Sequence, residues 1–299
     1  MASFLHSLFF GCFGRKRRSN SYERIPSNIP PRRSAIGAVR VVIQAANIQS
    51  KLLKPRPFVR LRVQGREEIA TISPAKDRTY SANWFYEPKY LLVYSLDERL
   101  EFEVMNHHKI VQPRLIGQAM FPLYYLDGDM KKIGEERTIF KHSESPKGTI
   151  LFDVFYYPAG MAYEKPPSSK TGIVSLHIQE VRHFKWDLYS EQPIKLSVTT
   201  SLGWNSPLIH HTVPSYFIDP PMWNSTFEFL CFDRSSTVVL KIVDGESSKT
   251  SAIYGHISVP LQELLAAEDG REWWPLSGCP GGELKVTAEW RPLEADSYP

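Results

Sequence analysis

The feature that most constrains this sequence is an internal repeat of about 120 residues. A glycine followed by apolar residues at every second position occurs twice, as GAVRVVI (37–43) and GIVSLHI (172–178). Four further pairs keep the same order, with all offsets within 134–139 residues: SANWFYEPKYLLV (81–93) with PPMWNSTFEFLCF (220–232), LEFEV (100–104) with VLKIV (239–243), LIGQAMFPL (115–123) with IYGHISVPL (253–261), and TILFDVFYYP (149–158) with ELKVTAEWRP (283–292). The chain is therefore expected to fold as two copies of one unit.

Each copy has roughly seven or eight short alternating segments with turn residues between them, which is typical of an antiparallel β-sandwich. Brief helices are expected only after the two Pro-Leu pairs, around 124–132 and 261–269. The predicted fold class is all-β, with two antiparallel eight-stranded sandwiches. The predicted boundaries are 1–34 for a basic amphipathic N-terminal arm, 35–158 for the first sandwich, 159–170 for a Pro/Ser linker, 171–294 for the second sandwich and 295–299 for a tail.

The spacing of the cysteines and the hydropathy of the sequence limit the classes of protein to which the chain can belong. Cys12, Cys231 and Cys279 lie far apart, which argues against a secreted disulfide framework. No apolar run reaches the roughly 20 residues of a membrane-spanning helix. The basic cluster at 15–18 follows the apolar stretch instead of preceding it, unlike a secretory signal. These features predict a cytoplasmic protein that is peripheral on the cytosolic face of a membrane.

Charge is distributed unevenly along the chain. Residues 1–34 hold seven basic residues and one acidic residue, a net charge of +6. Residues 35–158 carry +4, and residues 159–299 carry −6. This polarity predicts that the front half meets an anionic partner.

The order of the segments resembles that of a C2 domain: a strand, a loop, PFVRL (57–61), a Trp-bearing strand, Leu-x-Phe-x-Val, a polar loop, Ile-Gly and Pro-Leu. The most similar C2 domains are those of the tricalbin and extended-synaptotagmin proteins, which end much like WWPL (273–276) and GELKVTAEWRPL (282–293). The resemblance covers about 250 residues, excludes residues 1–34, and includes no lipid-transfer module.

The resemblance implies where calcium ligands would lie. In the first unit the five positions are Ser50, Arg56, Asn106, His108 and Arg114. Because calcium requires several oxygen ligands and none of these is a carboxylate, the first unit is predicted to be calcium-independent. The adjacent His107 and His108 are then interpreted as a solvated loop tip, since no third metal ligand follows at a recognisable spacing.

The second unit departs less from the calcium-binding pattern. Four acidic residues fall at or beside the ligand positions: Asp187, Glu191, Asp244 and Glu246. The closing position, however, is Ala252. An acidic loop rim is the favoured interpretation, and a calcium switch stays open as an alternative. No other cofactor is expected.

Residues 1–18 combine an apolar stretch with a basic cluster. Phe9, Phe10 and Phe13 would lie in the headgroup region if this stretch were helical. Cys12, among them, is a candidate for S-palmitoylation. The cluster of Arg15, Lys16, Arg17 and Arg18 would attract anionic lipid. The alternative is a disordered tail whose basic run is solvated or is a nuclear-import signal.

A second basic group lies in and after the first loop of the first unit: Lys51, Lys54, Arg56, Arg60, Arg62 and Arg66. In FVRLRV (58–63) the alternation places Arg60 and Arg62 on one face of a strand. These residues are predicted to contact lipid headgroups; the alternative is an ordinary polar sheet face.

No nucleophile elbow, phosphate-binding loop, zinc-protease helix or dinucleotide fingerprint is present, so a non-catalytic protein is expected. The sequence predicts a peripheral membrane adaptor that binds anionic phospholipids and no nucleic acid. The acidic second unit is expected to bind an unidentified protein partner or to hold the orientation of the first unit. Trp204 is an exposed candidate contact, and the Trp273-Trp274 pair is expected in packing. The alternatives are a protein–protein scaffold without lipid affinity, or the calcium-responsive second unit.

Overall fold

The computed structural model describes residues 34–49, 54–84, 88–108, 111–141, 145–161, 170–185, 194–216, 221–245, 252–267 and 272–293, with the backbone alone for 67–72. By internal contacts, Arg33–Pro299 form one unit and Met1–Arg32 another. Residues 1–33 of the predicted N-terminal arm lie outside the described residues.

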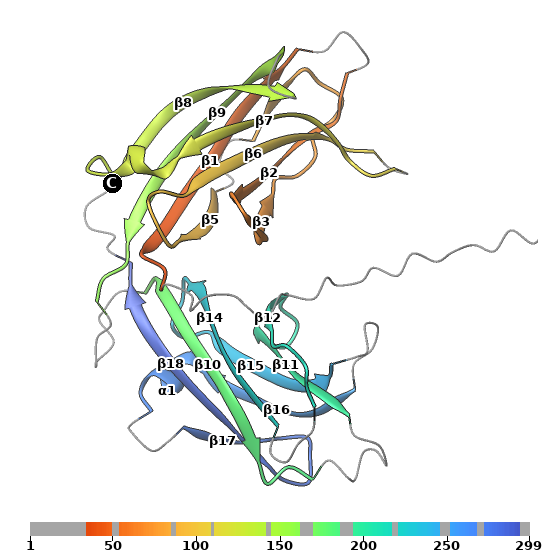
Figure 1. Cartoon of the computed structure of the whole chain (residues 1–299), viewed down its shortest axis with the longest axis vertical. Coiled ribbons are helices and arrows are strands. Elements are labelled where there is room, and N and C mark those ends of the chain that lie inside the picture. The colour runs from red at the N-terminus through yellow and green to blue at the C-terminus, as the bar shows by residue number, and fades with distance from the viewer. Residues whose placement is uncertain are drawn as a thin grey trace, which may run out of the picture. The chain divides into compact units, whose positions relative to one another are not determined.

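The first sandwich is built from the strands that precede residue 159 (Figure 1). They are β1 (Gly37–Ile48), β2 (Pro57–Val63), β3 (Arg66–Ile72), β4 (Ser81–Asn83), β5 (Pro88–Val93), β6 (Arg99–Asn106), β7 (Arg114–Pro122), β8 (Lys131–Lys141) and β9 (Ser145–Pro158). Two layers, β3-β2-β6-β7 and β8-β9-β1 with β4 and β5, are joined by a single pair, Gln118 with Phe140.

The second sandwich repeats this plan. Its strands are β10 (Gly172–Arg182), β11 (Lys195–Leu202), β12 (Leu208–His211), β13 (Ser215–Tyr216), β14 (Met222–Cys231), β15 (Thr237–Asp244), β16 (Ile253–Pro260), β17 (Trp273–Pro275) and β18 (Glu283–Pro292). The layers are β14-β10-β18-β17 and β12-β11-β15-β16, with β13 beside β11. The prediction of two antiparallel sandwiches in tandem is confirmed.

The described residues give nine strands in each sandwich, where the sequence predicted eight. In each case one edge strand is divided into two short pieces. Strands β4 and β5 both pair with β1, at successive positions along it, and β12 and β13 both pair with β11. Each pair therefore takes the place of one interrupted strand.

Alternation directs one face of each strand into a core. Val39, Val41 and Ile43 of β1 are buried, as the sequence predicted, and so are the corresponding residues of β10. The first core is filled by aromatic rings: Phe102 stacks on Phe152 with centroids 4.2 Å apart, and Phe121 meets Phe152 edge-on. Such burial supplies the main stabilisation of a sandwich.

The glycine that begins each repeat is required by the close approach of the last strand, through both its backbone and an aromatic ring. A Cβ at Gly37 would lie 2.4 Å from the carbonyl oxygen of Tyr157 and 2.7 Å from Cε2 of Tyr156, and one at Gly172 would lie 2.5 Å from Cζ2 of Trp290. Any larger residue there would displace a ring that belongs to the core.

Two predicted repeat pairs are out of register by one residue: LEFEV (100–104), and the YLLV end (90–93) of the Trp-bearing segment, where Val93 opposite Gly37 corresponds to Cys231 opposite Gly172. Pairing places Gly117 opposite Val104 and Gly255 opposite Ile242, so these strands correspond at an offset of 138. The sequence alignment of LEFEV with VLKIV used an offset of 139. It would make Phe102, which is buried in the first core, equivalent in the repeat to Lys241, which faces outward in the second sandwich. Because strand side chains alternate, a one-residue slip exchanges the two faces.

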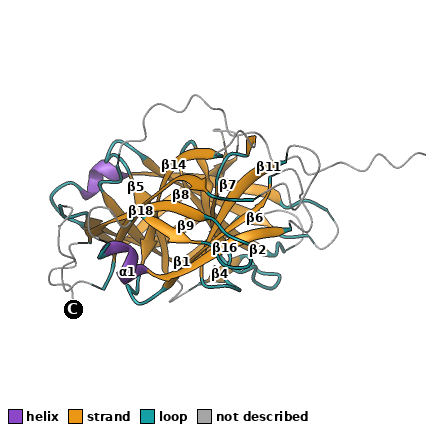
Figure 2. Ribbon diagram, turned by 90° about the horizontal axis from the view of Figure 1, so that it is seen from below, coloured by secondary structure: helices purple, strands orange, loops and turns teal. Residues whose placement is uncertain are grey.

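Helical segments are few in the described residues (Figure 2). A 3₁₀ turn, η1 (Leu123–Leu126), and a short helix, α1 (Leu261–Leu265), follow the two Pro-Leu pairs, as predicted, although both are shorter than expected. Their buried leucines close one end of each core. Among the described residues, no helix has the length and apolar character needed to cross a bilayer.

Candidate functional site

The expected calcium positions of the first sandwich meet at one end of it. Strand pairing sets Asn106 beside Pro57 on one side and beside Arg114 on the other. Arg56, Asn106 and Arg114 therefore lie together on the ends of β2, β6 and β7. Ser50 lies outside the described residues.

The side chain of Asn106 is already occupied by hydrogen bonds. Its Oδ1 accepts a hydrogen bond from the backbone N–H of Arg56 at 2.9 Å. Its Nδ2 lies 3.2 Å from Nε2 of His108, within hydrogen-bond distance. With cationic Arg56 and Arg114 beside this amide and no carboxylate among the four positions described, these residues do not fit a calcium ion.

His107 contacts the segment that leads into β2. The backbone N–H of His107 donates to the carbonyl of Arg56 at 2.8 Å, and its ring meets Phe58 edge-on with centroids 6.3 Å apart. Both histidines are half-buried, so the prediction of a solvated pair is revised. Within the described part of the chain, no group of three His, Cys, Asp or Glu side chains could hold a metal ion.

Cationic side chains surround this end of the sandwich, which we call the basic tip. Backbone hydrogen bonds bring its segments together. The N–H of Lys76 donates to the carbonyl of Pro57 at 2.9 Å, and the N–H of Gln49 donates to the carbonyl of Lys147 at 2.7 Å. The basic tip comprises Lys54, Arg56, Lys76, Arg78, Arg114 and Lys147.

The positive charges of the basic tip are largely without neighbouring negative charges in the described segments. The one acidic residue in its described segments is the exposed Asp77. No ion pair joins any of the six cations to another described residue. Lys54 is nevertheless oriented, with its ammonium 5.9 Å from the ring centroid of Tyr80. The tip is thus a concentrated positive surface.

An exposed apolar side chain lies in the loop that joins the strands at this end of the sandwich. Val111, between β6 and β7, is 53% exposed. Sequence reasoning passed over it, although an aliphatic residue in an otherwise polar loop is a usable signal for an interaction surface.

The arginines of β2 lie on one face, as predicted, but glutamates of β6 face them. Arg62 is paired with Glu101 at 2.8 Å and with Glu103 at 3.4 Å. Arg60, which is more exposed, is 3.5 Å from Glu103. Binding a headgroup through Arg62 would break an internal ion pair. The alternating glutamates of LEFEV were the overlooked signal.

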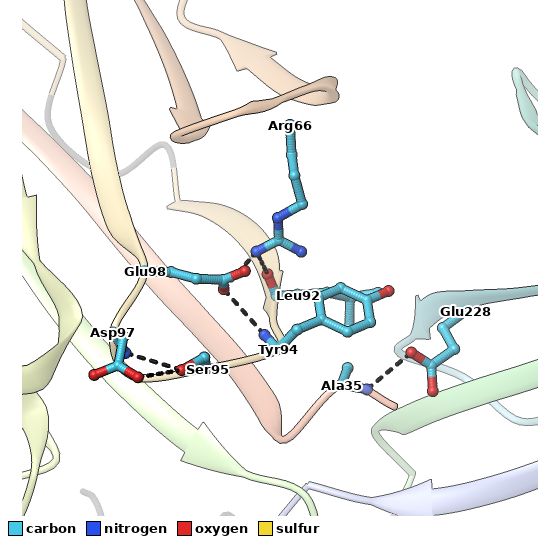
Figure 3. A network of polar contacts seen from close by, with 8 residues as sticks. All are labelled: Ala35, Arg66, Leu92, Tyr94, Ser95, Asp97, Glu98 and Glu228. Carbon is cyan, nitrogen blue, oxygen red and sulfur yellow. Dashed lines mark hydrogen bonds and ion pairs between the residues drawn. The ribbon is translucent and has the colours of Figure 1, made fainter. Parts of the chain in front are cut away.

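Arg66 lies at the other end of the sandwich from the basic tip, because β2 runs away from the tip and β3 begins after a tight turn. Its guanidinium donates to Glu98 at 2.5 Å and to the carbonyl of Leu92 at 3.3 Å, and it covers the ring of Tyr94 (Figure 3). The predicted basic group is therefore divided: Lys54 and Arg56 are at the tip, Arg60 and Arg62 on a sheet face, and Arg66 at the base.

Several predicted residues lie outside the described ranges: Phe9, Phe10, Cys12, Phe13, Arg15, Lys16, Arg17, Arg18, Lys51, Asp187, Glu191 and Glu246. Of the acidic positions in the second sandwich, Asp244 is described, at the end of β15 beside Leu196. Burial, and then the charge of Asp244, raise the pKa of Tyr254.

The tryptophans of the second sandwich divide between surface and core. Trp274 is buried and joins the core, as predicted. Trp273 faces outward, with the guanidinium of Arg182 4.0 Å from its ring centroid. Trp204 is 45% exposed, and the ammonium of Lys241 lies 4.6 Å from its ring centroid.

Comparison with known protein families assigns the class. The C2 domain family model matches residues 38–137 and 183–276, about two thirds of the chain. The chain belongs to the C2 domain family and carries two such domains in tandem, which correspond to the two sandwiches.

Two relatives show which C2 proteins this chain is similar to. Tricalbin-2 of Saccharomyces cerevisiae is 25% identical over 87% of this chain and 22% of its own length. An uncharacterised protein of Schizosaccharomyces pombe is 23% identical over 79% of this chain and 18% of its own length. The chain thus spans about a fifth of these relatives.

Among solved structures, the C2A and C2B domains of extended-synaptotagmin 2, in a calcium-bound form, superpose with a TM-score of 0.65 and 20% identity. That match covers 88% of this chain and 99% of the other. The chain is therefore a tandem C2 protein that resembles the tricalbin and extended-synaptotagmin C2 domains.

Proposed function

We propose that this chain is a non-catalytic adaptor, peripheral on the cytosolic face of a membrane, whose first C2 domain binds anionic phospholipid without calcium. The observation that carries this proposal is the basic tip: six cations that form no ion pair with any described residue stand where calcium-binding C2 domains gather carboxylates. A surface of this kind meets phosphate groups directly, with no metal to bridge them.

The expected strength of this contact is moderate. A basic residue near an anionic leaflet contributes about 1 kcal/mol, so six contribute about 6 kcal/mol, which corresponds to a dissociation constant of some tens of micromolar. Insertion of the exposed Val111 would add the burial of one aliphatic side chain.

A second attachment would raise this affinity. In the proposal it comes from the N-terminal arm: apolar insertion by Phe9, Phe10 and Phe13, attraction by Arg15 to Arg18, and acylation of Cys12. Because the arm and the domain are on one chain, the second contact is intramolecular and the two affinities multiply.

The second C2 domain has a different proposed role. Residues 159–299 carry a net charge of −6, which disfavours an anionic bilayer. We assign this domain to a protein partner, with the exposed Trp204 as a contact.

Cosedimentation of the full chain with lipid vesicles tests the proposal. Vesicles of phosphatidylcholine and phosphatidylserine should bind the chain at low salt, binding should weaken as salt rises, and phosphatidylcholine alone should bind little. Binding that ignores both phosphatidylserine and salt would reject the proposal in favour of a protein scaffold.

A further inference from the structure

Three serines of this chain are followed directly by a proline: Ser73, Ser145 and Ser206. A serine before a proline is the minimal sequence that proline-directed protein kinases phosphorylate. Because the kinase must reach the hydroxyl group, the surroundings of each serine in the folded chain decide whether it is a site of modification. The three serines differ in this respect.

Ser73 is inaccessible, although a lysine follows it at the third position, as many of these kinases prefer. The residue is 3% exposed. Its Oγ accepts a hydrogen bond from the backbone N–H of Val59 at 2.8 Å, and its own N–H donates to the carbonyl of Val59 at 2.8 Å. Phosphorylation of Ser73 would require these bonds to break inside the first domain.

Ser145 is accessible. It is exposed at the start of β9, and its hydroxyl group forms no hydrogen bond with another described residue. Strands β8 and β9 run side by side (Figure 1), and Ser145 lies opposite Lys141 at the end of their pairing. The neighbouring pair joins Phe140 to Pro146, which has no N–H to donate. This end of the hairpin is therefore held weakly and opens at low cost to a kinase.

Ser145 also lies beside the basic tip. Lys147, which belongs to the tip, follows it by two residues on β9, and the exposed Lys141 faces it across the hairpin. Strand geometry places the Cα atoms of both lysines within about 7 Å of that of Ser145. This separation is shorter than the screening length of about 10 Å at 0.1 M salt, so a charge on Ser145 acts on both lysines.

We propose that Ser145 is the phosphorylation site of a proline-directed kinase and that its phosphorylation releases the basic tip from anionic phospholipid. The inference rests on the proposed function. In the reaction, Oγ of Ser145 bonds to the γ-phosphorus of ATP, the bond from that phosphorus to the bridging oxygen breaks, ADP leaves, and the hydroxyl proton passes to a base of the kinase. The product carries a charge of roughly −1.5 to −2 at pH 7.

The added charge acts in two ways. It offsets the charges of Lys141 and Lys147, and it repels the anionic leaflet that the tip would otherwise approach. A change of nearly two charges at an anionic leaflet should weaken binding by about tenfold or more. The serine is thus an electrostatic switch at the membrane contact.

Phosphorylation of the full chain in vitro tests the site. The substrate carries Ser206→Ala, because Ser206 on the second domain is the other exposed serine before a proline. After treatment with a proline-directed kinase and ATP, mass spectrometry should find phosphate at Ser145 and none at Ser73. Binding to vesicles of phosphatidylcholine and phosphatidylserine should fall at least tenfold. The matched control, which also carries Ser145→Ala, should bind equally with and without the kinase.

Two charge variants separate position from net charge. Ser145→Asp should weaken vesicle binding about fivefold, whereas Ser206→Asp, with the same charge on the second domain, should change it less than twofold. Equal losses in these variants, or no phosphate at Ser145, would overturn the inference. Unchanged binding after phosphorylation, with salt-dependent binding of the unmodified chain intact, would overturn the switch alone. Salt-independent binding of the unmodified chain would reject the proposed function and the inference together.

Discussion

Neutralising two cations of the basic tip should weaken membrane binding by a calculable amount. The perturbation is Arg56→Gln with Arg114→Gln. The hydrogen bonds of Arg56 to Asn106 and His107 use its backbone, and neither guanidinium forms an ion pair with a described residue. The fold should therefore be unaffected.

The magnitude follows from the charge removed. Two basic residues near an anionic leaflet contribute about 2 kcal/mol, which is roughly a thirtyfold change in the partition coefficient. At high salt the difference should shrink, because ions screen exposed charges beyond about 10 Å at 0.1 M. Titration of the full chain with phosphatidylcholine–phosphatidylserine vesicles, followed by energy transfer from tryptophan to a labelled lipid, measures this quantity.

The control is Arg99→Gln. Arg99 is also exposed and lies on β6, but at its first residue, whereas Asn106 ends the strand at the tip. Its substitution removes one unit of charge far from the proposed contact and should change the partition coefficient by less than threefold. An equal loss in Arg99→Gln and in a single tip variant, Arg114→Gln, would show that only net charge matters and would refute the assignment to the tip.

Three further outcomes are expected. Val111→Asp should weaken vesicle binding about tenfold without lowering the melting temperature, because Val111 is 53% exposed; unchanged binding would exclude insertion. Gly172→Ala should destabilise the second domain by about 1–3 kcal/mol in chemical unfolding, because its Cβ would lie 2.5 Å from the Trp290 ring; an unaltered midpoint would contradict this close approach. Burial, and then the charge of Lys285, lower the pKa of His177 from 6.5, so the unfolded chain binds a proton at a higher pH than the folded chain does. The free energy of unfolding should therefore fall as the pH drops from about 7 towards 5. His177→Gln should make this decrease with pH smaller, and an unchanged pH dependence would contradict the prediction.

The sequence predicted the structure best where alternating apolar residues form the buried face of a strand. Val39 and Val41 could be placed in a core because strand side chains alternate and a sandwich buries one face. The short helical turns could be placed because a Pro-Leu pair ends a strand in both repeats. The one-residue slip at LEFEV arose because composition alone does not show which alternate residue faces inward.

The candidate site was predicted less completely, because its charges depend on neighbours in space. The sequence contains Arg62 and Glu101 at a separation of 39 residues, and only strand pairing shows that they neutralise each other. Lys147 joins the basic tip through a hydrogen bond to Gln49, far away along the chain. The residues that join the two domains were not predicted for a similar reason, since Ala38 and Ile173 are ordinary apolar residues in the sequence and only the structure places them in one buried cluster.

The most direct test of the central claim compares vesicle binding of the full chain in calcium and in a calcium chelator. The account predicts equal partition coefficients on phosphatidylserine vesicles, because Arg56, Asn106, His108 and Arg114 offer calcium no carboxylate. A severalfold increase in affinity on adding calcium would contradict the account. If the variant Asp244→Asn abolished that increase, the response would belong to the second domain.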